Sequence, residues 1–262
     1  MDTAYIIGNG ESRTIYPIEN LKENGIVYGC NAIYRDLPNL CDHIVAVNPP
    51  MYEELKKWYD ATRPNLKIHG PDDISDWNYI LPTDNNENEV PDGLKLYRIW
   101  RGGNIEKQGN KIRTIDFSTC KGSGMSAILL AAESGIKNVV IIAFDILGSR
   151  QWELDDGTQS RSQNNMYKDT LNYPSRMNMK AYLKYEWMYQ LRQIIRRFTE
   201  VNFYFINRKE NIYANHFLPH YFSVGSLEAK NKRQMKNIKV GTYGDLKRWA
   251  EGHKDRINWI KL

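Results

Sequence analysis

The stretch Ala4-Tyr5-Ile6-Ile7-Gly8-Asn9-Gly10-Glu11-Ser12-Arg13 decides the fold. Its first four residues are a short apolar run, which predicts a buried strand. A Gly-Asn-Gly turn follows the run directly, and a helical segment over residues 17–24 comes next. The chain is therefore predicted to begin with a strand, a turn and a helix, the opening of a βαβ unit.

The same alternation continues along the chain. Strands are predicted over residues 25–31, 43–48, 67–69, 138–146 and 202–206. Helices are predicted over residues 50–62, 122–134 and 176–199. Strands that alternate with helices predict an α/β fold, a Rossmann-like parallel sheet with helices on both faces.

Two polar segments interrupt this alternation. Residues 71–115 are rich in Asn and Gly and show no sustained period, so we interpret them as an insertion that contains a hairpin. Residues 147–175 form a second polar loop. We assign residues 1–207, with both segments, to one domain and residues 208–262 to a basic C-terminal extension.

The composition is that of a globular protein. The chain has 262 residues, of which 41% are hydrophobic and 26% charged. No apolar run approaches the ~20 residues that cross a membrane, so we expect no membrane partner. The first residues lack the features of a signal peptide, which favours a cytoplasmic location. Cys30, Cys41 and Cys120 are irregularly spaced, so neither a disulfide framework nor a cysteine metal site is predicted.

Positive charge gathers near the C-terminal end. The formal net charge is +5, and residues 230–261 hold ten Lys or Arg against three acidic residues. Tyr243, Trp249 and Trp259 are interleaved with them. This pattern fits either a solvated helical face or a surface that contacts the phosphates of double-stranded DNA.

Polar residues follow the predicted strands, where an open α/β sheet binds its ligands. Asn31 follows the second strand and Asn48 lies at the end of the third. Ser123 and Gly124 lie at the start of the later helix, and Asp145 lies near the end of the next strand. Amides, hydroxyls and glycine backbone groups of this kind hydrogen-bond a nucleotide or a sugar. The set lacks the Ser/His/Asp or Cys/His pairing of nucleophilic catalysis.

Two common nucleotide sites fit the sequence poorly. In a dinucleotide-binding turn the third glycine position would be Arg13, which is too bulky for close packing of the helix on the strand. The second strand ends in Asn31, where an NAD enzyme places an acidic residue that binds ribose. No GK[ST] follows a glycine-rich turn, which argues against a P-loop ATPase or kinase.

Several short motifs follow one another along the chain. They are Gly8-Asn9-Gly10-Glu11-Ser12, Gly29-Cys30-Asn31 with Tyr34-Arg35-Asp36, Val47-Asn48-Pro49, Gly122-Ser123-Gly124 and Phe144-Asp145. Over about the first 145 residues this order resembles bacterial sialyltransferases of the GT42 type. The form GNGESR followed by YGCNAIYRD is also similar to an uncharacterised sialyltransferase-like group in tailed bacteriophages. The resemblance implies a single Rossmann-like glycosyltransferase domain, a variant of the GT-A fold, with a lid over residues 147–175.

The resemblance also implies which residues bind the donor, a nucleotide-sugar such as a CMP- or UDP-sugar. Asn9 and Asn31 match residues that hold the phosphate and ribose, and Asn48 matches an asparagine near the cytidine. Ser123 and Gly124 match the Ser-Gly pair that contacts the donor. We assign the other residues of the first turn to donor binding as well: Gly8, Gly10, Ser12 and Arg13.

By the same resemblance, two lid tyrosines stabilise the leaving phosphate and a lid histidine acts as general base. Tyr167 and Tyr173 lie in the matching loop, but Leu147 stands at the first tyrosine position, and Tyr173 takes the place of the histidine. We therefore assign Asp145, Tyr167 and Tyr173 to catalysis, with Asp145 as the preferred acid or base. Other candidate bases are Asp116, Asp169, His216 and His220.

No metal site is assigned. The resemblance implies a metal-independent enzyme, so no cofactor is firmly implied beyond the nucleotide-sugar donor. A divalent ion would help a donor that carries a diphosphate, and two acidic pairs on polar loops are suited to bind one: Asp72-Asp73 and Asp155-Asp156.

These observations predict a nucleotide-sugar-dependent glycosyltransferase, an enzyme that moves a sugar to an acceptor hydroxyl. A phage enzyme with a basic, aromatic-bearing C-terminal segment would act on hydroxymethylated pyrimidines in DNA, presented out of the base stack. A sialyltransferase-like enzyme that acts on a cell-surface glycan is the alternative for the acceptor. A non-catalytic module that sequesters a nucleotide and a structural DNA-binding protein are the hypotheses from other classes.

Overall fold

The structure is a computed structural model of the chain. It describes residues 1–58, 67–69, 122–145, 165–167, 170–173, 181–209, 222–224 and 233–260. The insertion predicted over residues 71–115 lies outside the described residues, as does most of the lid predicted over residues 147–175.

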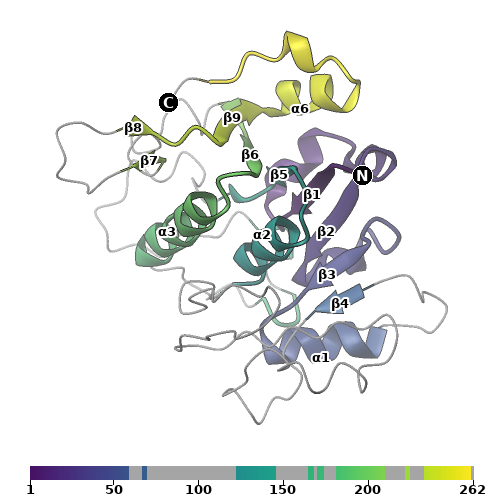
Figure 1. Cartoon of the computed structure of the whole chain (residues 1–262). Helices are drawn as coiled ribbons and strands as arrows, with labels where there is room; N and C mark the ends of the chain where they lie inside the picture. The colour runs from purple at the N-terminus through teal and green to yellow at the C-terminus, as the bar shows by residue number, and fades with distance from the viewer. Residues whose placement is uncertain are drawn as a thin grey trace.

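A seven-stranded sheet forms the centre of the described structure (Figure 1). Its strands stand in the order β4-β3-β2-β1-β5-β6-β9, and all neighbours pair in parallel. Their bounds are β1 Thr3–Ile7, β2 Ile26–Cys30, β3 His43–Val45, β4 Lys67–His69, β5 Asn138–Ile142, β6 Asn202–Asn207 and β9 Ile238–Thr242. A separate antiparallel ribbon pairs β7 (Ser223–Val224) with β8 (Arg233–Gln234). The prediction of a Rossmann-like parallel sheet is confirmed.

The strand order reverses beside β1. From β1 the chain adds β2, β3 and β4 on one side, and then returns to add β5, β6 and β9 on the other. Ile7 at the end of β1 pairs with Gly29 of β2 and with Ile142 of β5, so these three strands end nearly level. Open α/β sheets bind ligands at such a switch point, beyond the carboxyl ends of the strands. The loops after β1 and β5 therefore flank the expected ligand position.

Helices cover both faces of the sheet, as predicted. Side chains alternate along β1, so Ala4 and Ile6 pack on one face and Tyr5 and Ile7 on the other. The first face carries the helices α2 (Ser123–Glu133) and α3 (Ala181–Arg197). The opposite face carries α1 (Pro49–Trp58), α6 (Tyr243–Ala250) and the short 3-10 helices η2 (Ile18–Glu23) and η3 (Asn31–Arg35). Right-handed crossovers that run in opposite directions from β1 place their helices on opposite faces, which explains the positions of these helices except α6, which follows β9.

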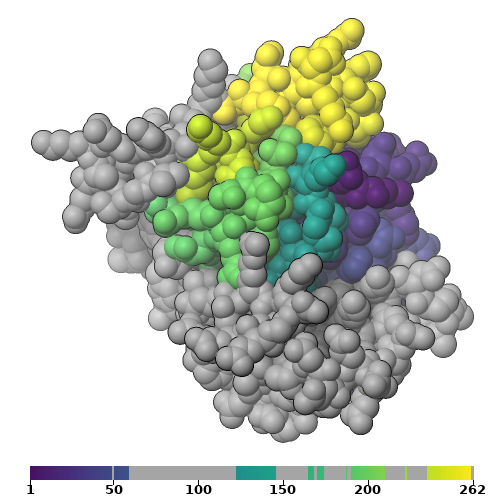
Figure 2. All heavy atoms as spheres, viewed as in Figure 1, coloured from purple at the N-terminus to yellow at the C-terminus, as the bar shows by residue number. Residues whose placement is uncertain are grey.

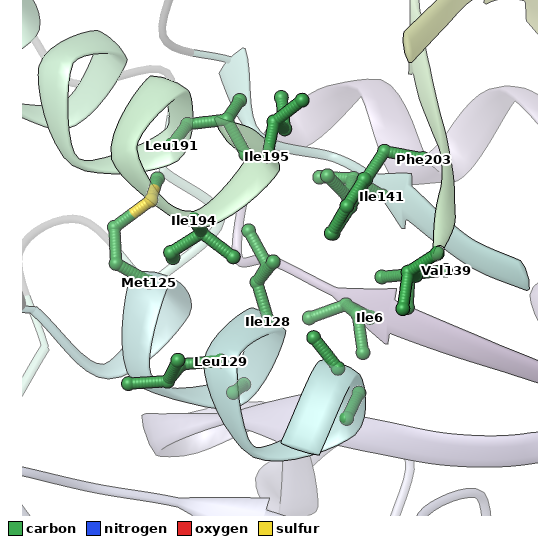
Figure 3. Packing of buried hydrophobic residues seen from close by; sticks show 14 of the residues in the cluster. Ile6, Met125, Ile128, Leu129, Val139, Ile141, Leu191, Ile194, Ile195 and Phe203 are labelled. Carbon is green, nitrogen blue, oxygen red and sulfur yellow. The ribbon is translucent and has the colours of Figure 1, made fainter. Parts of the chain in front are cut away.

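Figure 3 shows the core between the sheet and the α2–α3 pair. Ile128 of α2 and Ile194 of α3 lie against Ile6, Val139 and Ile141 of the strands. Nearly every residue of α2 is buried, because the helix lies between the sheet and α3. This position explains why its sequence, SGMSAILLAAE, has no polar stripe. Each fully buried Ile or Leu side chain contributes about 1.5–3 kcal/mol.

Several elements are shorter than the sequence predicts. β5 ends at Ile142, well before residue 146, because Ala143 has a φ of 58° that breaks the extended backbone. β3 ends at Val45, whereas the predicted strand reaches residue 48. The helix predicted over residues 17–24 is the 3-10 helix η2. Elements are therefore predicted more reliably than their ends.

The C-terminal segment belongs to the main sheet. β9 pairs with β6 from Ile238 beside Phe203 to Thr242 beside Asn207. Leu246 of α6 is fully buried, and the C-terminal residues pack directly against the rest of the described surface (Figure 2). The sequence-based prediction contains no strand after residue 208, because β9 is only five residues long and includes a lysine and a glycine. Residues of the predicted extension thus complete the sheet.

The edge of the sheet that β9 forms is covered by the residues after α6. The 3-10 helix η7 (Lys254–Arg256) leads the chain back, and Ile260 forms an antiparallel bridge with Val240 of β9. A Cβ on Gly241 would lie 2.8 Å from the Trp259 ring, so the indole lies directly on the strand. This cover protects an edge strand that would otherwise be open to pairing with another chain.

Candidate functional site

Two loops meet at the switch point. Gly8 N donates to the end of β5 at 2.8 Å, and Gly10 N donates to Ala143 O at 2.9 Å. Both glycines are required by this close approach, because a Cβ on Gly8 would lie 2.5 Å from Ala143 O. A Cβ on Gly10 would lie 2.5 Å from the carboxyl carbon of Asp145. The two predicted donor-binding glycines therefore let the loops after β1 and β5 touch.

Gly10→Ala is expected to destabilise the protein by about 1–3 kcal/mol, because the new methyl group collides with Asp145 and with the backbone of Ala143. Gly244→Ala is the matched control, since Gly244 is exposed in α6 and its Cβ would meet nothing nearer than 3.5 Å among the described atoms. There alanine is expected to stabilise the helix by up to about 1 kcal/mol. Urea unfolding measures both changes. A Gly10→Ala variant as stable as the wild type would contradict the close approach.

Two asparagine side chains and a tyrosine hydroxyl meet beyond β1 and β2. Asn9 Nδ2 donates to Tyr173 Oη at 3.1 Å, and the Asn31 side chain and the backbone of Ala32 also hydrogen-bond this hydroxyl. Asn9 Oδ1 is buried and has no hydrogen-bond partner among the described residues. Asn9, Asn31 and Tyr173 are named the Asn–Tyr cluster below. The structure thus brings together two predicted donor-binding residues and one predicted catalytic residue.

Ser123 fixes the orientation of the Asn31 amide. Its hydroxyl donates to Asn31 Oδ1 at 2.6 Å and accepts from Val47 N at 3.0 Å. Because Oδ1 is occupied, the amide nitrogen is the end of Asn31 that is left to donate to Tyr173. Asn31 has a φ of 51°, a left-handed conformation that asparagine tolerates better than most residues. Ser123 therefore connects the ends of β2 and β3 to the start of α2.

The Tyr173 hydroxyl is protonated at neutral pH. Burial raises the pKa of Tyr173 to about 12, although the hydrogen bonds from Asn31 and Asn9 act in the lowering direction. These groups donate to the phenolic oxygen, so the proton of the hydroxyl is left to donate to a further acceptor. An anionic oxygen of a ligand would fill that role.

Arg13 lies beneath Met166 and Tyr167, part of the predicted lid. Its side chain is only 2% exposed and is paired with the carboxylate of Asp36. Arg13 Nη2 also donates to Tyr167 Oη at 2.8 Å, and this hydroxyl in turn donates to Asp36. Burial raises the pKa of Tyr167, so its hydroxyl is protonated at neutral pH as well. Arg13, predicted to bind the donor, therefore forms its ion pair inside the protein, with Asp36. It also hydrogen-bonds the predicted catalytic residue Tyr167.

A second charged network holds the described residues 170–173, and the sequence did not predict it. Arg35 contacts Glu54 of α1 with two nitrogens, Nε and Nη2, at 2.7 and 2.6 Å. Arg35 Nη1 donates to Thr170 Oγ1 at 2.6 Å, and Asn172 Nδ2 donates to Glu54 Oε2 at 2.7 Å. Burial alone would raise the pKa of Glu54, but hydrogen bonds, chiefly from Arg35, hold it below its ordinary value. No sequence pattern marks Glu54, because this contact depends on how α1 packs beside η3.

Asp145 lies on the other side of the switch point and is held by Ser12. Ser12 N donates to Asp145 Oδ2 at 3.0 Å, and Ser12 Oγ donates to Asp145 Oδ1. Ser12 Oγ also lies 2.7 Å from the hydroxyl oxygen of Tyr243, the first residue of α6. Ser12 is fully buried, whereas Asp145 is partly exposed. Sequence reasoning missed Tyr243, because it lies in the segment predicted as a basic extension.

The other two predicted donor-binding residues differ in placement. A Cβ on Gly124 would lie 2.4 Å from the Phe144 ring, so this glycine lets α2 approach the loop after β5. Asn48 is exposed, and its backbone carbonyl accepts from Tyr52 N at 2.9 Å at the start of α1. Within the described residues, no hydrogen bond joins the Asn48 side chain to the Asn–Tyr cluster.

Several predicted residues lie outside the described part of the chain. They are the acidic pairs Asp72-Asp73 and Asp155-Asp156 and the candidate bases Asp116, Asp169, His216 and His220. Among the described residues, no group of three or more His, Cys, Asp or Glu side chains is placed to hold a metal ion. Of the helices that the structure describes, none is long and apolar enough to span a bilayer.

The basic residues near the C-terminal end lie partly on α6 and the turn after it. Lys247 and Arg248 each have an acidic neighbour on α6 or directly after it, at 3.9 and 2.7 Å. The positive charge of α6 is therefore partly neutralised by its own acidic residues. Elsewhere in this segment, the exposed cations among the described residues are Lys236, Lys254 and Arg256.

The site has two polar halves that meet at the switch point. The Asn–Tyr cluster lies beyond β1 and β2, and the group Ser12, Asp145 and Tyr243 lies beyond β1, β5 and β9. Comparison of the chain with protein-family models, with curated proteins and with solved structures found no match. A function for this chain therefore rests on the geometry of these two halves.

Proposed function

We propose that this chain is a nucleotide-sugar-dependent glycosyltransferase, which moves a sugar from a CMP- or UDP-sugar to an acceptor hydroxyl. The observation that carries the proposal is the Asn–Tyr cluster. Two amides and a protonated tyrosine hydroxyl converge beyond two adjacent parallel strands, next to the switch point. Parallel α/β sheets bind nucleotides at this position. The resemblance of the surrounding motifs to GT42-type sialyltransferases supports the same function.

Asparagine amides suit the ribose-phosphate part of such a donor. An amide donates to a phosphate oxygen through Nδ2 and accepts from a ribose hydroxyl through Oδ1. Asn9 Oδ1 is a buried acceptor without a partner among the described residues. A buried polar atom of this kind costs free energy until a ligand or water satisfies it. A ribose hydroxyl would supply the missing hydrogen bond.

The proposed transfer exchanges one C–O bond for another. The acceptor oxygen forms a bond to the anomeric carbon of the sugar, while the bond from that carbon to the donor phosphate breaks and the nucleotide leaves with both electrons. The acceptor hydroxyl gives its proton to Asp145, the partly exposed carboxylate at the switch point. Tyr173 donates a hydrogen bond to the leaving phosphate, whose negative charge grows as the bond breaks.

For the acceptor we propose a hydroxymethylated pyrimidine in double-stranded DNA, turned out of the base stack and modified in the cytoplasm. The support is the positive charge of the C-terminal segment, in which Lys236, Lys254 and Arg256 are exposed. Cations of this kind contact phosphates and make binding depend on salt. A cell-surface glycan would not require a basic surface.

Asn9→Ala is expected to weaken binding of CMP or UDP by about tenfold or more, since it removes a donor and an acceptor worth about 0.5–1.5 kcal/mol each. Asn31→Asp should weaken binding similarly, because it replaces an amide donor by a charge that repels phosphate and still tolerates the left-handed turn. Asn202→Ala is the control, since Asn202 is exposed at the opposite end of the sheet, at the start of β6. Titration calorimetry with CMP, UDP and their sugar conjugates measures the three variants.

Three outcomes separate this function from its rivals. Equal affinity of Asn9→Ala and Asn202→Ala for every nucleotide tested would show that the Asn–Tyr cluster does not bind the donor. Tight binding of a nucleotide-sugar without release of free nucleotide, in the presence of acceptor, would identify a sequestering module. Binding of DNA without affinity for any nucleotide would identify a structural DNA-binding protein.

A further inference from the structure

Tyr243 connects the C-terminal helix to Asp145 through one buried hydroxyl. It is the first residue of α6, it is buried, and its Oη lies 2.7 Å from Ser12 Oγ. Ser12 is 0% exposed and contacts both carboxylate oxygens of Asp145, one through its backbone N–H and one through its hydroxyl. Ser12 therefore links Tyr243 to Asp145, because it is hydrogen-bonded to both residues.

The protons of these hydrogen bonds point in one direction. Ser12 has one hydroxyl proton, which it donates to Asp145 Oδ1. The proton between Ser12 and Tyr243 must then come from Tyr243, whose oxygen is hydrogen-bonded by the backbone of Ala143. Ala143, Tyr243 and Ser12 thus form a relay of donors that ends on the carboxylate. In such a chain each hydrogen bond polarises the next one.

The end of β9 fixes the position of the Tyr243 hydroxyl. Thr242 and Asp245 form a capping box at the start of α6, in which Thr242 N donates to Asp245 Oδ2 at 2.8 Å. Thr242 is also the register partner of Asn207 in β6. Tyr243 is therefore held by the sheet and a capped helix, the rigid elements that orient functional groups best.

We infer that Tyr243 is a positioning residue for Asp145, which acts by fixing the Ser12 hydroxyl and, through it, the carboxylate that receives the acceptor's proton. The inference rests on the proposed function, because that function makes Asp145 the base. Tyr243 then sets the rate of sugar transfer and leaves the affinity for the donor unchanged. A tyrosine that only fills space would produce no such division between kcat and KM.

The test compares Tyr243→Phe with Tyr204→Phe. Both changes remove a hydroxyl from a buried tyrosine of the same core, but the Tyr204 hydroxyl approaches Asn138, at 3.4 Å, near the opposite end of the sheet. Tyr243→Phe is expected to lower kcat about tenfold and to leave KM for the nucleotide-sugar within about twofold. Tyr204→Phe is expected to change neither value by more than about twofold. Equal kcat in the two variants would overturn the inference.

Ser12→Ala provides a second arm. If Tyr243 acts through Ser12, adding Tyr243→Phe to Ser12→Ala costs no further activity, because the link is already broken. Losses that multiply in the double variant would show that the two residues act independently, which would also overturn the inference.

Failure of the proposed function gives a different result from failure of this inference. A wild-type chain that transfers no sugar refutes the proposed function, and amide hydrogen exchange over residues 8–12 then tests the coupling to Tyr243. Exchange there should be faster in Tyr243→Phe than in Tyr204→Phe, since the Ser12 N–H loses a fixed acceptor in Asp145. Equal exchange in the two variants would overturn the coupling whatever the activity.

Discussion

A chain that ends at residue 237 is expected not to fold at room temperature. The truncation removes β9, which pairs with β6 from Ile238 to Thr242. It also removes buried apolar side chains worth about 1.5–3 kcal/mol each. Among the described residues there are six of them: Ile238, Val240, Tyr243, Leu246, Trp249 and Ile257. Together they contribute up to about 9–18 kcal/mol, which is as large as the whole stability of a typical domain.

Circular dichroism and urea unfolding measure this loss. A chain that ends at residue 260 is the control, because it keeps the bridge between Ile260 and Val240 and should unfold like the full chain. A shortened chain that ends at residue 237 and still unfolds cooperatively, at an unchanged urea midpoint, would show that β9 and α6 are an appendage. That result would contradict their place in the core.

Asp145→Asn is expected to lower kcat for sugar transfer by about 100-fold or more, because a positioned general base contributes about 10²–10⁴-fold. Asparagine keeps an oxygen that accepts from Ser12, so the loop after β5 should remain in place. The amide cannot take up the acceptor's proton at neutral pH. KM for the nucleotide-sugar should therefore change little while kcat falls. Steady-state rates of nucleotide release measure both constants.

Asp42→Asn is the matched control for this prediction. Asp42 Oδ2 accepts from Val27 N at 2.9 Å at the start of β2, so it also holds a backbone N–H. It lies at the opposite end of the sheet from Asp145, and its variant should keep full activity. If Asp145→Asn is as active as Asp42→Asn, the Asp145 carboxylate serves only to hold its loop.

Local sequence patterns predicted the central elements of the fold well. The run Ala4 to Ile7 is buried on both faces of the sheet, as expected of an interior parallel strand. The apolar sequence of α2 likewise reflects burial that is nearly complete. β9 differs, because a strand that contains Lys239 and Gly241 forms only where the edge of β6 is available to pair with it. Tertiary pairing, and not propensity, makes it a strand.

The same distinction explains what was predicted of the site. Asn9, Asn31 and Tyr173 were assigned from their motifs and a resemblance, and the structure brings them together. Ser12 and Arg13 were assigned with them, but both are buried and bind partners inside the protein. Sequence could not show the contact between Ser12 and Tyr243, since 231 positions separate them and only the order of the strands brings them together.

Mass measurement of nucleosides after reaction tests the proposed enzyme most directly. Purified protein is incubated with DNA that contains hydroxymethylcytosine and with a panel of CMP- and UDP-sugars, and the DNA is then digested. We expect a nucleoside heavier by one sugar residue, together with free CMP or UDP, and about 100-fold less of both products from Asp145→Asn in the same time. Release of free nucleotide without a heavier nucleoside would show that the acceptor is a different hydroxyl, and the proposal of a transferase would stand. Neither nucleotide release nor a heavier nucleoside with any donor, alongside tight nucleotide binding, would contradict a glycosyltransferase and identify a sequestering module.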